Sequence, residues 1–469
     1  MSFLWSTEAF VAAAGGRLAG HAPSGVAGVS IDSRSIGPGE AFVAIHGPKR
    51  DGHAFVGAAL AAGAALAVVQ DGRAADDVGP LLLVPDDPLA ALNRIGAAAR
   101  ARISGSVVAV TGSVGKTGTK EMLRLALSPL GPTHAPEGSF NNQWGVPLTL
   151  ARMPADTQYG IFEIGMNHPG EIRPLVKAVR PHVAIVTAVA PVHLAYFDSE
   201  AAIADAKAEI FEGLEPDGTA VLNRDNEWYE LLAERAAARG ARIISFGEHA
   251  SADVRLEQAS LGGEGSSVKA VFAGEPVTYR LGAPGRHLVQ NSLAVLAAVN
   301  ALGADLTRVM LALAQFRAPK GRGERLQLRH PSGPFTLIDE SYNANPASTR
   351  AALALLGQTN PRGRGRRIAV LGDMRELGDS APALHRGLLP AVEESGADLV
   401  FLAGPLMHSL WQDLPEQRRG AYAASAAELQ PILLETVGPG DVIMMKASLG
   451  TELGPVVDAL KRYFARGAE

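Results

Sequence analysis

The stretch AVTGSVGKTGTKEM, residues 109–122, joins an apolar run to a segment with helical character. The run SVVAVTG, residues 106–112, predicts a buried strand, and a helix is expected from about Gly118. A glycine-rich turn between a buried strand and a helix presents backbone N–H groups and the positive end of the helix dipole to a phosphate. The stretch therefore predicts a phosphate-binding loop at the centre of an α/β domain.

The spacing of this loop departs from the common phosphate-loop pattern. That pattern has a glycine where this chain has Val110, and the early glycine here is Gly112. A chance Gly-Lys-Thr in a surface turn is the alternative, but the strand before it and the helix after it favour a shorter nucleotide loop. We expect Lys116 to neutralise the outer phosphates and the Thr117 hydroxyl to reach Mg²⁺. The residues expected around the nucleotide are Gly112, Ser113, Val114, Gly115, Lys116, Thr117 and Gly118.

The composition excludes several classes of function. The chain has 469 residues, enough for two to four domains of about 100–200 residues each. A formal net charge of −5 gives no basic field for nucleic acid, so no nucleic-acid partner is expected. The absence of cysteine excludes disulfides and thiolate chemistry and suits a reducing compartment. No apolar run approaches the ~18–20 residues that cross a bilayer, so we expect a cytoplasmic protein without membrane insertion.

Three regions of the chain differ in their patterns. Residues 1–84 contain the apolar runs AFVAIHG and AALAVVQD around AALAAGA, which indicates a small α/β N-terminal domain. Residues 85–318 alternate strand-like runs with helical patterns, which indicates a doubly wound parallel sheet around the phosphate loop. Residues 319–469 follow a linker rich in Pro, Gly and charge and contain four further strand-like runs, typical of a Rossmann-like domain. We therefore predict an α/β protein of three domains.

Two residues near strand ends are candidate metal ligands. Glu163, in IFEIGMNHPGE, ends an apolar run, where a carboxylate is costly unless a cation lies beside it. Ligands of doubly wound sheets bind at the carboxyl ends of the strands, so Glu163 is interpreted as a Mg²⁺ ligand. An outward-facing edge residue is the alternative. His193, in TAVAPVHLAYF, follows the next strand-like run and is a second candidate, although a packed or exposed histidine gives the same pattern. Lys207, in DAKAEIFEGL, would repel a cation, so the residues alone favour a solvated helix lysine.

These segments together resemble the Mur ligases of peptidoglycan precursor synthesis, over nearly the whole chain. TGSVGKTGTKEM is similar to the family's short phosphate loop, EIGMNHPGEI to its metal-ligand segment, and DAKAEIFEGL to the segment with a lysine carbamylated by CO₂. The resemblance implies a central P-loop ATPase domain, ATP and Mg²⁺ as cofactors, and a carbamylated Lys207 as an anionic metal ligand. It thus reverses the interpretation of Lys207 from the residues alone. The metal ligands it implies are Thr117, Glu163, His193 and Lys207.

The resemblance also implies an activity. DESYNANPAS, residues 339–348, is similar to the signature of the family member that joins D-alanyl-D-alanine to UDP-N-acetylmuramoyl-tripeptide, and GSFNNQWGVPLTL and GDMRELG agree with it. The implied reaction is an ATP-dependent amide ligation through an acyl phosphate. Its site is divided among three domains, which are expected to close when the substrates bind. Another amino-acid-adding Mur ligase and a folylpolyglutamate synthase are alternatives, and outside the ligases a nucleotide-dependent switch. A monomer is expected.

Further site residues follow from matching segments. In GRHLVQNSLAVLAA, His287 and Asn291 match a segment beside the adenine, and Asp339 is expected to help seat the nucleotide. The catalytic arginine before the third domain could be Arg322 or Arg325, and we expect Arg325 from its distance to Asp339. Substrate contacts are expected from Ser33, Arg34, Asn141, Asn142, Tyr342, Asn343 and Asn345, although the Asp-Ser-Arg segment also forms ordinary turns. Many members have Lys-Gly-Ser-Arg near the C-terminus, where this chain has KASLGTEL, so the role of that arginine does not transfer.

Overall fold

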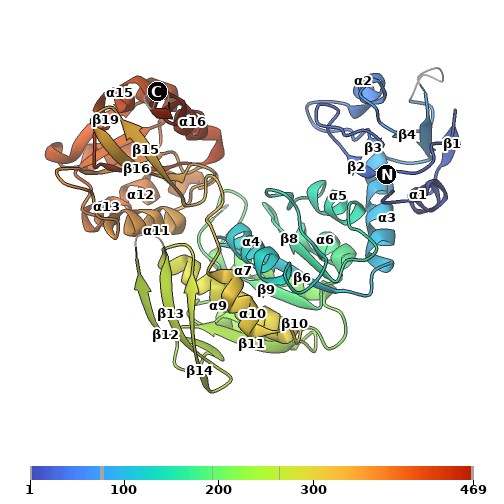
Figure 1. The fold of residues 1–469 in the computed structure, drawn as a ribbon, viewed down its shortest axis with the longest axis horizontal. Helices are drawn as coiled ribbons and strands as arrows, with labels where there is room; N and C mark the ends of the chain where they lie inside the picture. Colours follow the sequence, from blue (N-terminus) through green and yellow to red (C-terminus); the bar gives the residue numbers. More distant parts are fainter. Residues whose placement is uncertain (1–2, 74–78, 193, 263–264, 466–469) are drawn as a thin grey trace.

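The computed structural model describes residues 3–73, 79–192, 194–262 and 265–465. Three β-sheets follow one another along the chain, of five, nine and six strands. Figure 1 shows the N-terminal and C-terminal sheets on opposite sides of the central one. The predicted three-domain α/β fold is confirmed. In the described parts of the chain, no helix is both long and apolar enough to cross a membrane.

The N-terminal sheet has the strand order β1-β5-β4-β3-β2, with β1 antiparallel to β5 and the other pairs parallel. Its core joins the sheet to α3 (Pro88–Ala101), whose Leu92 and Ile95 are fully buried there. The domain boundary after residue 84 stays a prediction. The remaining elements are α1 (Thr7–Ala14), α2 (Val56–Ala61), β1 (Arg17–Ala19), β2 (Gly28–Ser30), β3 (Glu40–Val43), β4 (Leu66–Gln70) and β5 (Leu81–Val84).

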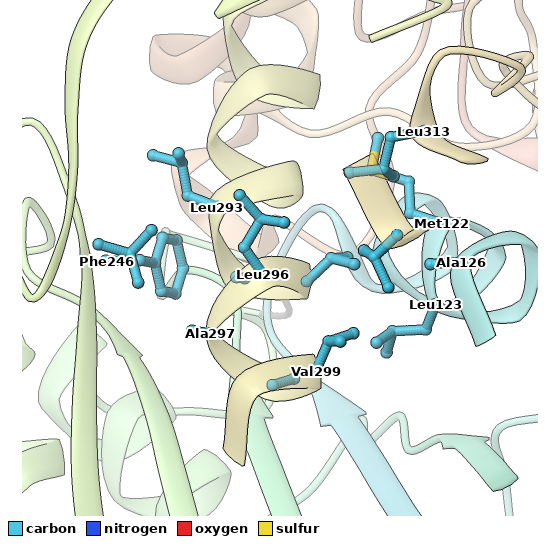
Figure 2. Packing of buried hydrophobic residues seen from close by; sticks show 14 of the residues in the cluster. Met122, Leu123, Ala126, Phe246, Leu293, Leu296, Ala297, Val299 and Leu313 are labelled. Carbon is cyan, nitrogen blue, oxygen red and sulfur yellow. The ribbon is translucent and has the colours of Figure 1, made fainter. Parts of the chain in front are cut away.

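The central sheet has the order β14-β13-β12-β11-β10-β9-β6-β8-β7. Separate apolar clusters cover its two faces, as expected for a doubly wound sheet. Figure 2 shows one of them, with Leu293 and Leu296 between Phe246 and Met122. The first strands are β6 (Ser106–Thr111), β7 (Thr133–His134), β8 (Tyr159–Glu163), β9 (Val183–Val186), β10 (Thr219–Asn223) and β11 (Arg242–Gly247). The helices are α4 (Lys116–Leu127), α5 (Gly145–Ala151), α6 (Ile172–Val179), α7 (Glu200–Ala208), α8 (Tyr229–Ala237), α9 (Arg286–Ala301) and α10 (Leu306–Leu313).

The sequence patterns predicted a parallel central sheet, but the sheet also contains antiparallel pairs. Strand β12 (Val254–Leu261) pairs parallel with β11, but β13 (Ser266–Phe272) and β14 (Glu275–Leu281) add antiparallel hairpins at its edge. Buried and exposed residues alternate along β13, which is typical of a strand with one face in water. Strands were predicted from continuous apolar runs, and β13 was missed because polar residues alternate with apolar ones along it.

The C-terminal sheet has the order β15-β16-β20-β17-β18-β19, and all pairs except β15 with β16 are parallel. The loops after β16, β17, β18 and β20 therefore leave the same edge of the sheet. The strands are β15 (Glu324–His330), β16 (Gly333–Glu340), β17 (Arg367–Gly372), β18 (Leu399–Ala403), β19 (Arg419–Ala423) and β20 (Val442–Lys446). The helices are α11 (Pro346–Gly357), α12 (Ala381–Arg386), α13 (Leu389–Glu394), α14 (His408–Asp413), α15 (Ala426–Thr436) and α16 (Leu453–Ala465).

Candidate functional site

The loop between β6 and α4 has a backbone that only glycine tolerates at two positions. Gly112 has φ 149°, and a Cβ there would lie 2.0 Å from Thr187 Oγ1. Gly115 has φ 87°, and a Cβ there would lie 2.8 Å from Asn291 Oδ1. Helix α4 begins at Lys116, two residues before the predicted start. The short glycine spacing is thus imposed by the neighbours of the loop, and the helix N-terminus points its free N–H groups at the loop.

The end of β9 fixes the shape of the loop. Ser113 Oγ donates to the carbonyl of Ala190 at 3.0 Å, and Thr187 Oγ1 donates to the carbonyl of Val114 at 2.5 Å. The side chain of Lys116 folds back to donate to the carbonyl of Gly112 at 2.5 Å. The loop is therefore formed before a phosphate arrives, which lowers the entropic cost of binding.

Glu163 lies beside the first turn of α4. It is 1% exposed, and its two carboxylate oxygens accept from Thr117 Oγ1 at 2.8 Å and from Asn141 Nδ2 at 2.7 Å. Thr117 Oγ1 is also 3.3 Å from Ser139 Oγ. Among the described residues the hydrogen-bond donors to this carboxylate are neutral, and the nearby Lys116 ammonium interacts with its charge. The end of β8 thus presents a buried carboxylate next to the phosphate loop, and its role as a metal ligand stays a prediction.

The donor set fits Mg²⁺, which prefers oxygen ligands and keeps several sites for phosphate and water. A hydroxyl and a carboxylate oxygen lie together at the helix N-terminus. No group of three or more His, Asp or Glu side chains suited to a metal occurs in the described residues. His193, predicted as a second ligand, lies outside the described residues.

Two lysines lie near each other at the site, Lys207 buried and Lys116 partly buried. Lys207, on α7, is 2% exposed, so the solvated helix lysine that the residues alone favoured is wrong. Burial, with Lys116 nearby as a smaller cause, holds the pKa of Lys207 well below its usual range. Burial also lowers the pKa of Lys116, while the Glu163 carboxylate acts in the opposite direction. Burial and the positive charge of Lys116 both disfavour the ammonium form of Lys207.

The linker before the C-terminal domain brings Arg322 to the phosphate loop. Its Nη2 donates to Ser139 Oγ at 3.1 Å, its guanidinium lies 4.2 Å from the ring centre of Tyr342, and its charge lowers the pKa of Lys116. Arg325 Nη2 instead donates to Thr359 Oγ1 at 2.8 Å, inside the C-terminal domain. Of the two arginines, Arg322 contacts the residues around the phosphate loop through Ser139, and which of them is catalytic stays a prediction. The distance from Asp339 along the sequence could not show which arginine reaches the loop. Strand β15 begins at Glu324, so Arg322 lies in the linker and Arg325 lies in the strand, and the two side chains have different partners.

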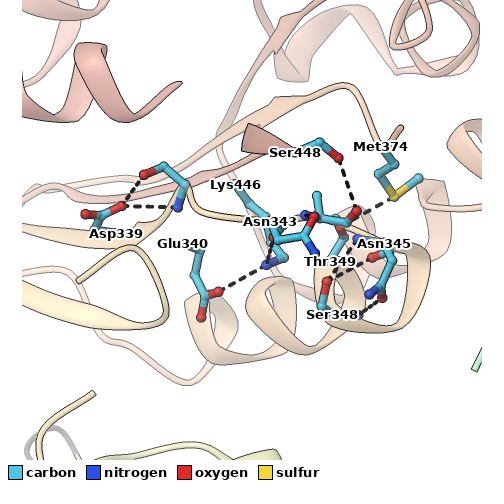
Figure 3. A network of polar contacts seen from close by, with 11 residues as sticks. Asp339, Glu340, Asn343, Asn345, Ser348, Thr349, Met374, Lys446 and Ser448 are labelled. Atoms are coloured by element: carbon cyan, nitrogen blue, oxygen red, sulfur yellow. Dashed lines mark hydrogen bonds and ion pairs between the residues drawn. The ribbon is translucent and has the colours of Figure 1, made fainter. Parts of the chain in front are cut away.

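The loop after β16 forms a polar network in the C-terminal domain (Figure 3). Asn345 caps α11, because its side chain accepts from Ser348 N at 2.8 Å. Lys446 is 3% exposed and donates to Glu340 Oε2 and to the carbonyl of Asn343, each at 3.0 Å. The cap and the buried ion pair hold the loop in place, so the Asn345 side chain has a structural role, and Tyr342 is half-exposed beside Arg322.

The residues predicted at the nucleotide base come from two domains. Asn291 is 8% exposed on α9 and packs against Gly115. Burial lowers the pKa of His287, and Glu340 and Lys446 of the C-terminal domain influence it in opposite directions. Asp339 is fully buried, where one oxygen accepts from Ser341 Oγ at 2.6 Å and the other lies 3.8 Å from Lys461 Nζ. Asp339 is thus turned into the C-terminal domain.

The predicted substrate residues of the first two domains have local partners. Arg34 is exposed and pairs with Asp32 at 2.6 Å, and Ser33 lies in the same turn. Asn142 accepts from Gly145 N at 2.9 Å at the start of α5, so it also acts as a helix-start residue. These contacts neither require nor exclude a substrate, and the substrate roles stay predictions.

A small cavity opens at the strand ends of the C-terminal sheet. It measures about 210 Å³ and is lined by loops that include Asp373, Arg375, Gly404, Ser425 and Gly450. Asp373 is 4% exposed and burial raises its pKa. A Cβ at Gly404, which has φ 104°, would lie 2.4 Å from Asp373 Cγ, so glycine is required there. The Arg375 guanidinium donates to the carbonyl of Gly450, within the segment KASLGTEL. The cavity therefore joins a carboxylate and a guanidinium in one space.

Several residues of the site were not singled out by sequence reasoning. Ser139 lies in the loop after β7, Lys120 on α4 donates to carbonyls of that loop, and Asp373 and Arg375 line the cavity. The only signal for Arg375 was its place in GDMRELG, directly after a strand-like run, where ligands of α/β sheets bind. Lys120 gave no signal, because a lysine followed by a glutamate on a helix is typical of a solvated face.

Family models match the three parts of the chain. The Mur ligase family catalytic domain matches residues 25–100, the Mur ligase middle domain residues 110–299, and the Mur ligase glutamate ligase domain residues 324–449.

Individual proteins are similar over nearly the whole length. The chain is 31% identical to the UDP-N-acetylmuramoyl-tripeptide--D-alanyl-D-alanine ligase of Rickettsia prowazekii, over 92% of this chain and 94% of the relative. It is 36% identical to the enzyme of the same name from Escherichia coli, over 81% and 82%. A crystal structure of MurF from Acinetobacter baumannii matches with a TM-score of 0.85 and 32% identity, covering 98% of this chain and 99% of that one. The family models and these relatives show that the chain belongs to the Mur ligase family.

Proposed function

We propose that this protein joins D-alanyl-D-alanine to UDP-N-acetylmuramoyl-tripeptide with ATP, making the pentapeptide precursor of peptidoglycan. Relatives named for this reaction cover most of the chain, and the fold matches theirs. The observation that carries the proposal is the cluster of Lys116, Thr117 and Glu163 at a phosphate loop that Arg322 of the next domain reaches. Such a cluster suits transfer of a γ-phosphate to a group held between domains. A monomeric state and a cytoplasmic location stay predictions.

The reaction needs an activated carboxylate. A carboxylate is a poor acyl donor because its leaving group would be oxide. Attack of a carboxylate oxygen of the tripeptide on the γ-phosphorus breaks the bond to ADP and gives an acyl phosphate. The amine of D-alanyl-D-alanine then attacks the carbonyl carbon, the bond to phosphate breaks, and the amine loses a proton. Enzymes of this kind act chiefly by positioning and charge neutralisation.

Each charged residue then has a task. The Lys116 ammonium and the N-terminus of α4 hold the β- and γ-phosphates, and Arg322 faces the γ-phosphate from the linker. Thr117 and Glu163 would hold Mg²⁺, which supplies charge neutralisation of the phosphates when bound. Asn141 keeps the Glu163 carboxylate oriented through its 2.7 Å hydrogen bond. Asn291 and His287 help to seat the nucleotide. Because these groups lie on two domains, their approach also excludes water from the acyl phosphate.

Carbamylation of Lys207 fits its surroundings. The unprotonated amine forms a bond to the carbon of CO₂ and releases a proton, so that the side chain becomes an anionic carbamate. A buried lysine with a lowered pKa supplies the unprotonated amine. The carbamate would be attracted to Lys116, whereas the ammonium is repelled by it. It would also supply oxygen ligands to a second Mg²⁺, together with His193.

The cavity in the C-terminal domain suits the dipeptide. D-alanyl-D-alanine is a zwitterion, and the cavity presents the Asp373 carboxylate and the Arg375 guanidinium. Its volume of about 210 Å³ lies below the ~300–1,000 Å³ of pockets for drug-sized ligands, so a small ligand is favoured. The next residue, Glu376, accepts a hydrogen bond from Ala195 N of the central domain at 3.4 Å. The cavity therefore lies on the same loop that contacts the central domain. Tyr342 and Asn343 remain candidates for a contact to the dipeptide.

The direct test incubates the protein with ATP, Mg²⁺, UDP-N-acetylmuramoyl-tripeptide and D-alanyl-D-alanine. We expect phosphate release that requires both substrates, and a product whose mass is that of the pentapeptide nucleotide. Phosphate release without the dipeptide and without any product would indicate a nucleotide switch. Product formation with a single amino acid in place of the dipeptide would indicate another Mur ligase.

Replacement of the two linker arginines separates their roles. Arg322→Ala should lower kcat by about 10²-fold or more, because it removes a charge that faces the phosphates. Arg325→Ala should keep kcat near the wild-type value but lower the free energy of unfolding by about 1–3 kcal/mol, since it breaks a partly buried hydrogen bond to Thr359. Steady-state kinetics and denaturant unfolding measure both. The reverse pattern would restore Arg325 as the catalytic residue.

Lys207→Ala should lower kcat by about 10²-fold or more, since the carbamate oxygens are lost. Formate or acetate should restore part of the activity by replacing those oxygens. In the wild type, removal of CO₂ and bicarbonate should lower activity reversibly. Lys177→Ala, at an exposed lysine of the same domain, is the control and should behave as wild type. Full activity of Lys207→Ala would contradict the carbamate.

Arg375→Ala tests the dipeptide site. We expect the KM for D-alanyl-D-alanine to rise about tenfold, the loss of one charged hydrogen bond of ~1.4 kcal/mol, with the KM for ATP unchanged. Arg462→Ala, at an exposed position on α16, is the control. An unchanged KM for the dipeptide in Arg375→Ala would place its binding elsewhere.

A further inference from the structure

Lys120 is a fully buried lysine that the proposed chemistry does not use. It lies on α4, one turn after Lys116 and Thr117, and its side chain is 0% exposed. Its Nζ donates to Glu121 Oε1 at 2.5 Å and to the carbonyls of Pro136 and Gly138, both at 2.9 Å. An ammonium has three N–H donors, so all three are used. Since an unpaired buried charge is costly, this arrangement fixes the two carbonyls firmly to α4.

The segment held by Lys120 carries two residues of the site. Residues 136–141 lie between β7 and α5, and Ser139 follows directly after the Gly138 carbonyl. Ser139 Oγ contacts Thr117 Oγ1 at 3.3 Å and accepts from Arg322 at 3.1 Å. Asn141 donates to Glu163 at 2.7 Å, and its carbonyl accepts from Gly165 N at 2.8 Å. The segment thus connects α4, the end of β8 and the linker.

The chain offers a comparison that lacks this connection. Arg100 is 4% exposed in the central part of the molecule, where it donates to the carbonyls of Val179 and Arg180 at 2.7 Å and lies 3.4 Å from Glu215. It too is a buried cation with two carbonyls and one carboxylate. The carbonyls it holds lie at the end of α6, and none of these contacts involves the phosphate loop or Glu163. A cation of this kind stabilises the fold alone.

We infer that Lys120 is a positioning residue for the metal site: by fixing residues 136–141 to α4, it holds the Asn141 amide on Glu163 and the Ser139 hydroxyl on Thr117. This inference rests on the proposed function, because the cation it serves is the Mg²⁺ of the nucleotide. The carboxylate then keeps one oxygen bound to Asn141 while the other faces the Thr117 hydroxyl. Without Lys120 the segment would lose its attachment to the helix that carries Thr117.

The test compares Lys120→Met with Arg100→Met as the matched control. In the ligand-free protein, Lys120→Met should speed hydrogen exchange of peptides that cover residues 136–142 and 164–167, while Arg100→Met should speed it only around residues 179–180. Calorimetric titration with ADP, with and without Mg²⁺, measures the factor by which Mg²⁺ raises the affinity for ADP. This factor should be about tenfold smaller in Lys120→Met than in the wild type. Arg100→Met should keep the wild-type gain. Lys120→Gln retains two N–H donors, so its Mg²⁺-dependent gain in affinity should lie between those of the wild type and Lys120→Met. It replaces Lys120→Met in the comparison if that variant does not fold.

A double variant tests whether Lys120 acts through Asn141. Asn141→Ala alone should reduce the Mg²⁺-dependent gain, and its combination with Lys120→Met should reduce it little further, because both remove the same contact to Glu163. Additive losses, or a Lys120→Met protein with the wild-type gain, would overturn the inference. If Mg²⁺ does not raise the affinity of the wild-type protein for ADP, the proposed function is contradicted. The hydrogen-exchange comparison then still decides whether Lys120 fixes residues 136–141.

Discussion

A buried negative charge at the end of β8 is the constraint on which the site depends. Glu163 is almost inaccessible to water, and neutral groups hold its oxygens in one orientation. Such a charge is stable only where the surroundings supply compensation, here the Lys116 ammonium and the cation that the site is proposed to bind. The glycines of the loop, the hydroxyl of Thr117 and the amide of Asn141 can all be understood as arrangements around this carboxylate.

The same site connects the central and C-terminal domains. The linker places Arg322 against Ser139, and the loop after β17 touches the central domain through Glu376 and Ala195. Nearby, His287 responds to the charges of Glu340 and Lys446. Groups of the C-terminal domain and its linker are thus coupled to the charges beside the phosphate loop. This coupling suits a reaction in which one domain holds the nucleotide and another delivers the amine.

The sequence predicted the parts of the site that local rules determine. The phosphate loop could be located because a buried strand, glycines and a helix leave a clear pattern, and Glu163 because it interrupts an apolar strand. The three-domain fold followed from alternating patterns, and the resemblance to the Mur ligases is confirmed by the family matches.

Other features depend on tertiary contacts that no local pattern encodes. Lys207 and Lys120 lie on helices with mixed polarity, and only packing shows that each is buried. Arg322 and Arg325 are three residues apart, and the start of β15 decides which one reaches the loop. The hairpins of β13 and β14 were missed because their alternation is short and polar. The first domain boundary and the role of His193 stay predictions.

The central claim is that the γ-phosphate activates a carboxylate. The most direct measurement uses UDP-N-acetylmuramoyl-tripeptide with ¹⁸O in its terminal carboxylate and determines the isotope content of the phosphate released during ligation. Activation through an acyl phosphate predicts one ¹⁸O atom in each phosphate. Phosphate that carries no ¹⁸O would show that water receives the phosphoryl group, and would contradict the account.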